Sequence, residues 1–181
     1  MKKRTVVLIL AIVLVLGISI GGTVAWLTAV TDPVPNTFTV GNIEIDLDES
    51  DDLDLTMVPG NTITKDPAVT VYGGSEECWL FVEIEKSANF DDFMTYEVIG
   101  GENGWTALEG HPGVYYRKVA ASESNQVVGI LTNDQVTVKS TVTKGDMDAL
   151  TEETLPTLTF TAYAVQSAHF ATAADAWDEA K

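Results

Sequence analysis

Cysteine, histidine and basic residues are scarce in this 181-residue chain, and each shortage excludes a class of chemistry. A single cysteine, Cys78, excludes an internal disulfide framework, so the core must hold without covalent cross-links. Two histidines, His111 and His169, give no His-Glu-x-x-His pair that would place two zinc ligands on one helix face. With 27 acidic against 10 basic residues the net charge is -17, which disfavours binding to nucleic acid or anionic membranes.

Nucleophilic and phosphate-binding motifs are also missing from the chain. It contains no Gly-x-Ser-x-Gly elbow and no glycine-rich phosphate loop directly after a predicted strand. Cys78 begins an alternating segment, 78–84, whose even-numbered residues share one face, so we predict a buried strand residue rather than a nucleophile. We therefore expect no enzyme activity. One alternative stays open: an extracellular metal-dependent protease whose zinc is held by the two histidines and a carboxylate.

The N-terminus has the three parts of a secretory signal. Three basic residues at positions 2–4 precede an uncharged run that extends to Thr31 and is almost wholly aliphatic in its centre. Small residues follow this centre and end at Ala25. This order of basic, apolar and small residues is typical of a cleavable signal peptide. We predict cleavage between Ala25 and Trp26, so that residues 1–25 are a signal and the mature chain is secreted.

An uncleaved membrane anchor is the alternative for this segment, because an apolar run of about 18 or more residues is long enough to span a bilayer. The small residues before the predicted cut favour cleavage. The signal holds three of the ten basic residues and no acidic one, so its removal changes the net charge from -17 to -20. A charge of that size makes self-association depend on salt, divalent cations or low pH.

The predicted cleavage site lies in a Gly-Gly-Thr-x-Ala-aromatic junction at 21–26, and Asn-Thr-Phe-Thr-x-Gly-Asn-Ile-x-Ile follows at 36–45. These two motifs resemble those of the TasA/camelysin family of secreted bacterial proteins. The turn at 58–65 and the C-terminal segment at 160–177 also resemble family members. The resemblance implies a jelly-roll β-sandwich, cleavage by a SipW-type signal peptidase in a Gram-positive bacterium, and assembly into biofilm-matrix fibres. Some camelysin-like relatives are described as metalloproteases, which makes the protease alternative worth testing.

The pattern of the chain after the signal predicts an all-β fold. Short runs rich in Val, Ile, Thr and aromatic residues alternate with turn sequences such as Pro59-Gly60 and Gly73-Gly74. Strands at this spacing are typical of an antiparallel sandwich or barrel, and the family resemblance implies the jelly-roll form. We predict strands at residues 36–40, 43–47, 62–65, 68–72, 79–85, 96–99, 114–119, 127–131, 136–142 and 158–165.

Short helical insertions are expected at three places. Segments 146–153 and 173–180 hold good helix formers, and segment 86–95 is suited to a helical turn between two strands. No internal repeat and no linker rich in proline or serine divides the chain. We predict one β-sandwich domain over residues 36–181, preceded by an N-terminal extension over residues 26–35.

An acidic run leaves the predicted strand 43–47 and is the best candidate for a metal site. Clustered carboxylates suit Ca²⁺, a hard cation that prefers oxygen ligands. The run does not match an EF-hand loop, because position six is Asp51 rather than glycine and position twelve is Met57. The alternative is a solvated loop. The candidate calcium ligands are Asp46, Asp48, Asp51, Asp52 and Asp54.

The extension at the predicted mature N-terminus is a candidate donor strand. An extended terminus can add a strand to the open sheet edge of a neighbour, with main-chain hydrogen bonds supplying affinity. Residues 26–35 carry one charge, Asp32, and Pro33 and Pro35 oppose pairing as a regular central strand. The family resemblance implies fibres built by this exchange. The predicted donor consists of Trp26, Leu27, Thr28, Ala29, Val30 and Thr31, with Trp26 and Leu27 as the plugs.

Together with the resemblance, these features predict a secreted structural subunit of biofilm-matrix fibres, located in the extracellular matrix or at the cell surface. Its expected partners are further copies of itself, the signal peptidase and an accessory protein that anchors the fibre. No nucleic acid partner is expected, and membrane contact ends when the signal is cleaved. No cofactor is expected other than calcium. A monomeric, calcium-binding adhesion module of the cell surface is the second alternative.

Overall fold

The computed structural model describes residues 42–50 and 56–181 of the chain, which belong to one compact unit, Val40–Lys181. The predicted signal, the predicted donor strand and the predicted strand 36–40 lie outside the described residues. Of the described residues, 41% lie in strands and 17% in helices, and every strand pairing is antiparallel. The prediction of an all-β fold with short helical insertions is therefore confirmed.

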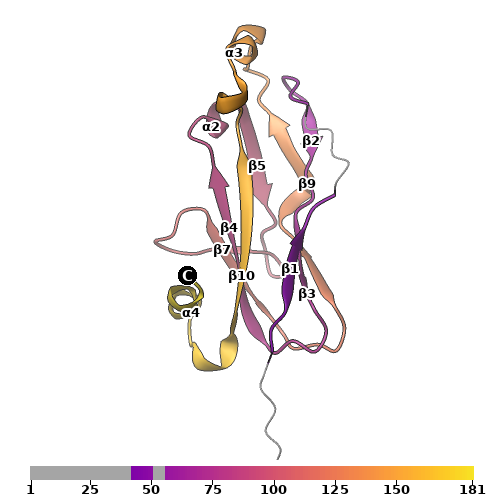
Figure 1. Ribbon diagram of the computed structural model, residues 1–181, viewed down its shortest axis with the longest axis vertical. Helices are drawn as coiled ribbons and strands as arrows, with labels where there is room; N and C mark the ends of the chain where they lie inside the picture. The colour runs from indigo at the N-terminus through magenta and orange to yellow at the C-terminus, as the bar shows by residue number, and fades with distance from the viewer. Residues whose placement is uncertain (1–41, 51–55) are drawn as a thin grey trace, which may run out of the picture. The chain divides into compact units, whose positions relative to one another are not determined.

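The strands and helices of the described residues follow one another in the order labelled in Figure 1. The strands are β1 (Ile45–Asp48), β2 (Thr62–Thr64), β3 (Ala68–Val71), β4 (Cys78–Lys86), β5 (Met94–Val98), β6 (Thr106–Ala107), β7 (Val114–Val119), β8 (Gln126–Gly129), β9 (Leu131–Val138) and β10 (Leu158–Gln166). The helices are α2 (Phe90–Phe93), α3 (Lys144–Asp148) and α4 (Ala173–Ala180), with 3-10 turns η1 (Glu152–Thr154) and η2 (Ser167–His169).

One layer of the domain is built from two short sheets, in the orders β1-β3-β8 and β2-β9-β5. Only Ile130 separates β8 from β9, and residues 65–67 separate β2 from β3. Main-chain hydrogen bonds cross this junction, because the Ile130 N–H donates to Pro67 O (3.1 Å) and the Ile99 N–H donates to Ile130 O (2.9 Å). The two short sheets therefore continue each other as one interrupted layer.

The second layer has the order β10-β4-β7-β6, with β4 in a central position. The predicted buried face of β4 is confirmed, because Cys78, Leu80, Val82 and Ile84 are all buried. They pack against apolar side chains of the first layer, including Val69 and others from β3, β8 and β9. The main core therefore lies between the two layers, as expected for a sandwich in which alternate residues point inward.

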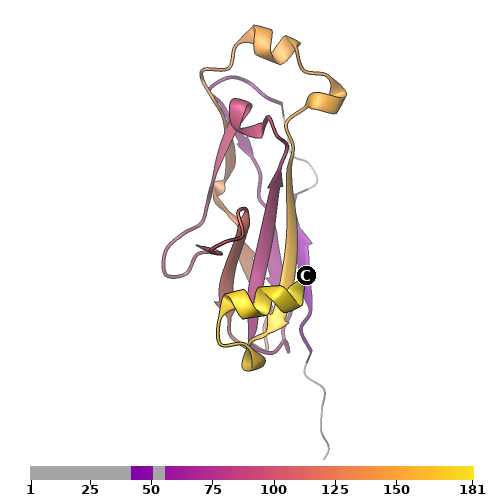
Figure 2. The same ribbon diagram turned by 90° about the vertical axis from the view of Figure 1, so that its left-hand side faces the viewer.

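Helix α4 covers the outer face of the second layer (Figure 2). The helix begins after Thr172, whose Oγ1 accepts a hydrogen bond from the Asp175 N–H (3.2 Å). Ala173, Ala176 and Trp177 lie at the i, i+3 and i+4 spacing of one helix face and are buried. They form a second apolar cluster with side chains of β4, β7 and β10, so β4 is packed on both faces.

The region of β9 differs from the prediction. Asn133 and Asp134, which fall in the gap between the predicted strands 127–131 and 136–142, lie inside β9 with φ of 57° and 52°. The strand continues because the register against β5 shifts between Tyr96 and Val98, which absorbs the additional residues as a bulge. The predicted strand 136–142 is wrong beyond Val138, where the chain enters a turn.

The predicted helix 146–153 is also wrong in its extent. Helix α3 begins earlier because Thr143 and Asp146 form a reciprocal capping box, with the Thr143 N–H donating to Asp146 Oδ2 (2.8 Å). Thr151 caps the separate turn η1 through Thr154, so the helix does not continue. The short strand β6 was not predicted, because two residues carry no readable alternation.

Candidate functional site

The residues of the predicted signal cut and donor strand lie outside the described part of the chain. Ala25 and Trp26, and the donor residues up to Thr31, therefore remain sequence predictions. The structure does describe Asp46 and Asp48 of the metal candidates, both histidines, Cys78 and the edge strands of the three sheets.

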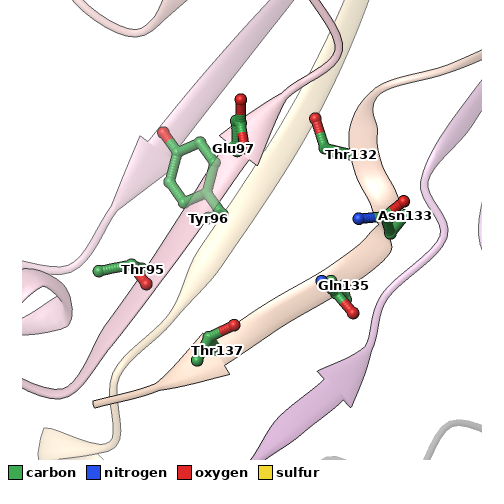
Figure 3. Close-up of a pocket in the computed structure, with 7 residues that line it drawn as sticks. All are labelled: Thr95, Tyr96, Glu97, Thr132, Asn133, Gln135 and Thr137. Atoms are coloured by element: carbon green, nitrogen blue, oxygen red, sulfur yellow. The ribbon is translucent and has the colours of Figure 1, made fainter.

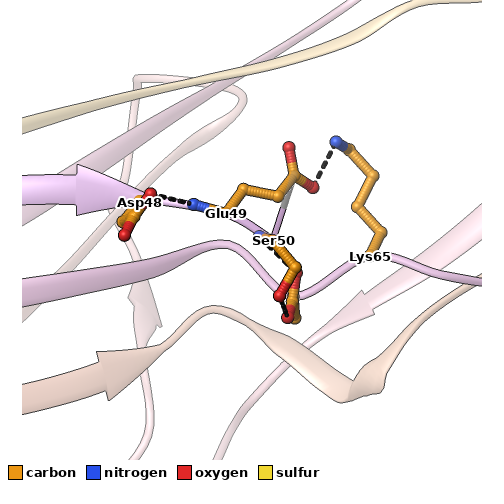
Figure 4. Close-up of polar contacts among 5 residues, drawn as sticks. Asp48, Glu49, Ser50 and Lys65 are labelled. Carbon is orange, nitrogen blue, oxygen red and sulfur yellow. Dashed lines mark hydrogen bonds and ion pairs between the residues drawn. The ribbon is translucent and has the colours of Figure 1, made fainter. Parts of the chain in front are cut away.

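The acidic segment that leaves β1 is tied to the loop after β2 (Figure 4). Asp46 and Asp48 are exposed on the outward face of β1. Glu49 forms an ion pair with Lys65 (2.5 Å between Oε1 and Nζ). Ser50 donates two hydrogen bonds to Asp66, from its N–H (3.1 Å) and from its hydroxyl (2.5 Å). These contacts join the segment to its neighbour through residues that were not among the predicted calcium ligands.

The hydrogen bonds from Ser50 lower the pKa of Asp66, so its carboxylate is held in the ionised form. No group of three histidine, cysteine, aspartate or glutamate side chains comes together as a metal site within residues 42–50 and 56–181. Asp51, Asp52 and Asp54 lie outside the described residues, so the calcium site stays a prediction.

The two histidines have different surroundings. His111 lies in the turn before β7 and packs edge-on against Trp177 of α4, with ring centroids 6.1 Å apart. His169 lies exposed at the end of η2. Neither belongs to a group of three metal-ligand side chains in the described part of the chain, and the predicted protease alternative gains no support.

The predicted burial of Cys78 is confirmed, because its side chain is fully enclosed in the main core. Burial, with a smaller contribution from Glu77, raises the pKa of its thiol to about 11. A thiol with so high a pKa is protonated at neutral pH and is a poor nucleophile.

A polar hollow lies on β5 and β9 beside the bulge (Figure 3). Hydroxyl and amide side chains from both strands line it, together with the carboxylate of Glu97. Neither His111 nor His169 nor Cys78 is among the lining residues, so no nucleophile-and-base pair is assembled there.

The open edge of β10 is the most unusual surface in the described residues. This nine-residue strand pairs with β4 on one side and with no described strand on the other. It contains no Asp, Glu, Lys, Arg or Pro, and the chain is free of charged side chains from Thr154 to Ala174 apart from His169. Natural edge strands are normally short, charged, bulged or interrupted by proline, which prevents them from pairing with other chains. β10 has none of these features, since its register against β4 is uninterrupted.

The other edges of the described sheets do carry such protection. β1 has four residues and exposes Asp46 and Asp48. The uncharged edge strand β8 is limited to four residues, β2 to three and β6 to two. β5 exposes the carboxylate of Glu97 where its register against β9 shifts. β10 is therefore the edge at which strand addition meets the least resistance.

Main-chain groups of alternate β10 residues point to this open edge. Just before the strand, Thr157 O accepts from the Ser87 N–H (3.0 Å), and just after it the Ser167 N–H donates to Glu77 O (2.9 Å). The register between these two bonds is one-to-one. Because bonded and non-bonded residues alternate in an antiparallel pair, the odd-numbered residues bond to β4 and the even-numbered residues direct their N–H and C=O outward.

A groove runs beside the first half of β10, between β10 and the facing layer. We call it the seam groove. The groove has two parts, and Lys65 and Leu158 line both of them. The part toward the start of β10 has a volume of about 380 Å³. Apolar side chains dominate that part, which we call its apolar end: Met57, Ile63, Met94, Val136, Leu155 and Leu158.

Sequence reasoning predicted strand 158–165 but not its position at an edge. The available signal was the uncharged stretch 154–174 in a chain that is otherwise strongly acidic. No helix in residues 42–50 and 56–181 is long and apolar enough to cross a bilayer. No family model, curated protein or solved structure matches this chain.

Proposed function

We propose that this chain is a secreted, non-enzymatic subunit of extracellular fibres, which polymerises by donating its N-terminal strand to the sheet of the next copy. The observation that carries this proposal is the open edge of β10, nine residues long and without a charge, a proline or a bulge. An edge of this kind is a template for strand addition.

The donor is the uncharged segment Trp26–Thr31, exposed at the new N-terminus once the signal is removed. The mature chain carries a net charge of -20, so most pairs of surfaces on two copies repel each other. An uncharged donor and an uncharged acceptor edge avoid that repulsion locally. Cleavage after Ala25 is therefore the step that makes the subunit competent to assemble.

The fold that we propose is a jelly roll, in agreement with the resemblance to the TasA/camelysin family. Its support is the connectivity, because the chain passes from one layer to the other between β3 and β4, β4 and β5, β5 and β6, β7 and β8, and β9 and β10. Repeated crossing between two antiparallel layers is typical of jelly rolls. On this proposal a SipW-type peptidase releases the subunit, and the fibres belong to a biofilm matrix with an accessory anchoring protein.

The test compares the protein beginning at Trp26 with a version beginning at Asn36, which keeps the whole described domain. Both are incubated with and without Ca²⁺ and at mildly acidic pH, then examined by negative-stain microscopy and size-exclusion chromatography. We expect fibres from the first and monomers from the second. Monomers from both under every condition would remove strand donation as an autonomous mechanism.

A further inference from the structure

We propose that the apolar end of the seam groove is the pocket that receives Trp26 and Leu27 of a second copy. This inference rests on the proposed function, since it assigns the place where the donor strand is anchored. In strand addition the main chain supplies general affinity, while side chains that enter pockets fix the register. The groove lies directly beside the outward-facing main-chain groups of Leu158 and Phe160.

The chemistry of the groove suits a large apolar side chain. Its volume of about 380 Å³ lies within the range of pockets that bind ligands, about 300–1,000 Å³. Leu155 at its rim is 49% exposed, and Val58, next to the lining residue Met57, is 44% exposed. Clustered exposure of apolar side chains marks an interaction surface, whereas a single exposed residue does not.

Charge also favours the uncharged N-terminal segment as the occupant. Lys65, the positively charged side chain that lines the groove, is already paired with Glu49. Its ammonium group lies over the ring of Phe160, 5.6 Å from the ring centroid. The groove therefore offers no free positive charge to the acidic segments that dominate the mature chain. The six residues Trp26–Thr31 extend over about 20 Å as a strand, which is enough to pair along more than half of β10.

The place where the described domain begins favours the donor of a second copy, rather than the chain's own N-terminal segment, as the occupant of the groove. Asn42 O accepts a hydrogen bond from the Glu76 N–H (3.0 Å), next to the start of β4. The start of β4 is paired with the end of β10, at Gln166, whereas the apolar end of the groove lies at the start of β10. The donor of the same chain would have to run back along the whole of β10 to reach its own groove, whereas the donor of a second copy has no such constraint.

The experiment is selective disulfide cross-linking between two copies that begin at Trp26. One copy carries Leu27→Cys and the other Leu155→Cys, and the two are mixed, allowed to assemble and then oxidised. The native Cys78 does not interfere, because it is fully buried. We expect a covalent dimer in which mass spectrometry identifies the link between positions 27 and 155. The matched control replaces Leu155→Cys by Val127→Cys, an aliphatic position that is 70% exposed on β8, and we expect no link.

A second pair of variants tests the pocket without a cross-link. Leu155→Asp places a carboxylate where the donor plug must enter, and Val127→Asp adds the same charge elsewhere. We expect fibre growth to slow about tenfold or more for Leu155→Asp, which corresponds to a loss of about 1.4 kcal/mol in binding. For Val127→Asp we expect a change of less than about twofold.

The outcomes separate this inference from the proposed function. Fibres that form without a 27–155 link, and that tolerate Leu155→Asp, would overturn the pocket and leave strand donation standing. An intramolecular link in a chain carrying both cysteines, with no link between mixed copies, would assign the pocket to the chain's own terminus. Absence of fibres from the unmodified protein would instead remove the proposed function itself.

Discussion

The sheet β10-β4-β7-β6 has an outer face that is covered by a helix, which we call the sealed face, and an open edge at β10. Different chemical groups form these two surfaces. Its outer face is covered by α4, where Trp177 packs against Phe81 and Tyr163 with ring centroids 5.2 Å apart in both pairs. Its edge at β10 has no strand paired with it among the described residues. The face is closed by large aromatic side chains of α4, β4 and β10, whereas the edge presents the main-chain groups of an uncharged strand.

This difference is what the strand-donation proposal requires of the β10 edge. A chain that closes an apolar face with its last helix could have protected β10 with one lysine or proline, as the neighbouring β1 is protected by Asp46 and Asp48. Covering a face stabilises the single domain, while an open edge leaves the domain able to pair. The following predictions test the two surfaces separately.

The largest effect is expected from Trp177→Ala, which opens the sealed face. Trp177 is 3% exposed and is the centre of the cluster under α4. Truncating a buried tryptophan costs about 3–5 kcal/mol of unfolding free energy, and urea denaturation of the version beginning at Asn36 measures it without a contribution from assembly. Val127→Ala, at a 70% exposed position, is the control, with an expected change within about 0.5 kcal/mol. A loss below about 1 kcal/mol for Trp177→Ala would mean that α4 does not close the face.

The next largest change in unfolding free energy is expected from a proline substitution in β10. Its size should depend on whether the proline replaces a residue that bonds to β4 or a residue that faces the open edge. Thr161→Pro removes an N–H on the side that bonds to β4 and leaves a buried acceptor unpaired, so we expect a loss of about 1–3 kcal/mol. Ala162→Pro removes an N–H on the open side, where proline is tolerated in an edge strand, and we expect less than about 1 kcal/mol.

Assembly should respond in the opposite way to stability. Ala162→Pro is expected to abolish fibres although the domain remains folded by circular dichroism, because the donor strand loses a central hydrogen-bond partner. Fibres of normal yield from Ala162→Pro would show that β10 is not the acceptor edge, and the strand-donation proposal would then need another edge.

The sealed face was more predictable than the open edge, because its elements depend on local pattern. Helix 173–180 was predicted with the bounds that α4 has, and the alternation in 78–84 predicted β4 and its inner face, although not the burial of Phe81 under α4. Strand order depends on pairings between residues far apart in the sequence, such as Gln166 with Cys78, and no local pattern encodes them. For this reason the sequence predicted the strand at 158–165 without placing it at an edge.

A third prediction uses ionic strength to distinguish the two surfaces. Raising the salt concentration from about 0.01 M to about 1 M shortens the Debye length from about 30 Å to about 3 Å. Because residues 26–181 carry a net charge of -20, screening removes repulsion between copies of the protein beginning at Trp26, and we expect fibre growth to accelerate about tenfold or more. The cluster under α4 is apolar, so near-ultraviolet circular dichroism of Trp177 in the non-assembling version that begins at Asn36 should change little. Growth independent of salt would contradict a charge-limited assembly.

The smallest effect is expected from pH at the polar rim of the sealed face. Glu83 accepts hydrogen bonds from Lys181 Nζ (2.6 Å) and from the Tyr163 hydroxyl (3.1 Å), and the bond from Lys181 is the main cause that lowers its pKa. A carboxyl group with a lowered pKa stabilises the folded state above its ordinary pKa, near 4.5, and that contribution is lost as the pH falls through the folded value. Glu83→Gln should therefore lower the melting temperature slightly at pH 7 and by less at pH 3.

The matched control for this change is Glu102→Gln, an exposed glutamate in the loop before β6. We expect its melting temperature to follow that of the unmodified protein at both pH values, measured on the version that begins at Asn36 so that assembly does not contribute. Equal curves for Glu83→Gln and the unmodified protein would mean that the Lys181 contact does not hold the end of α4. The face would then be closed by the aromatic cluster alone, which sharpens the contrast with an edge that offers only its main chain.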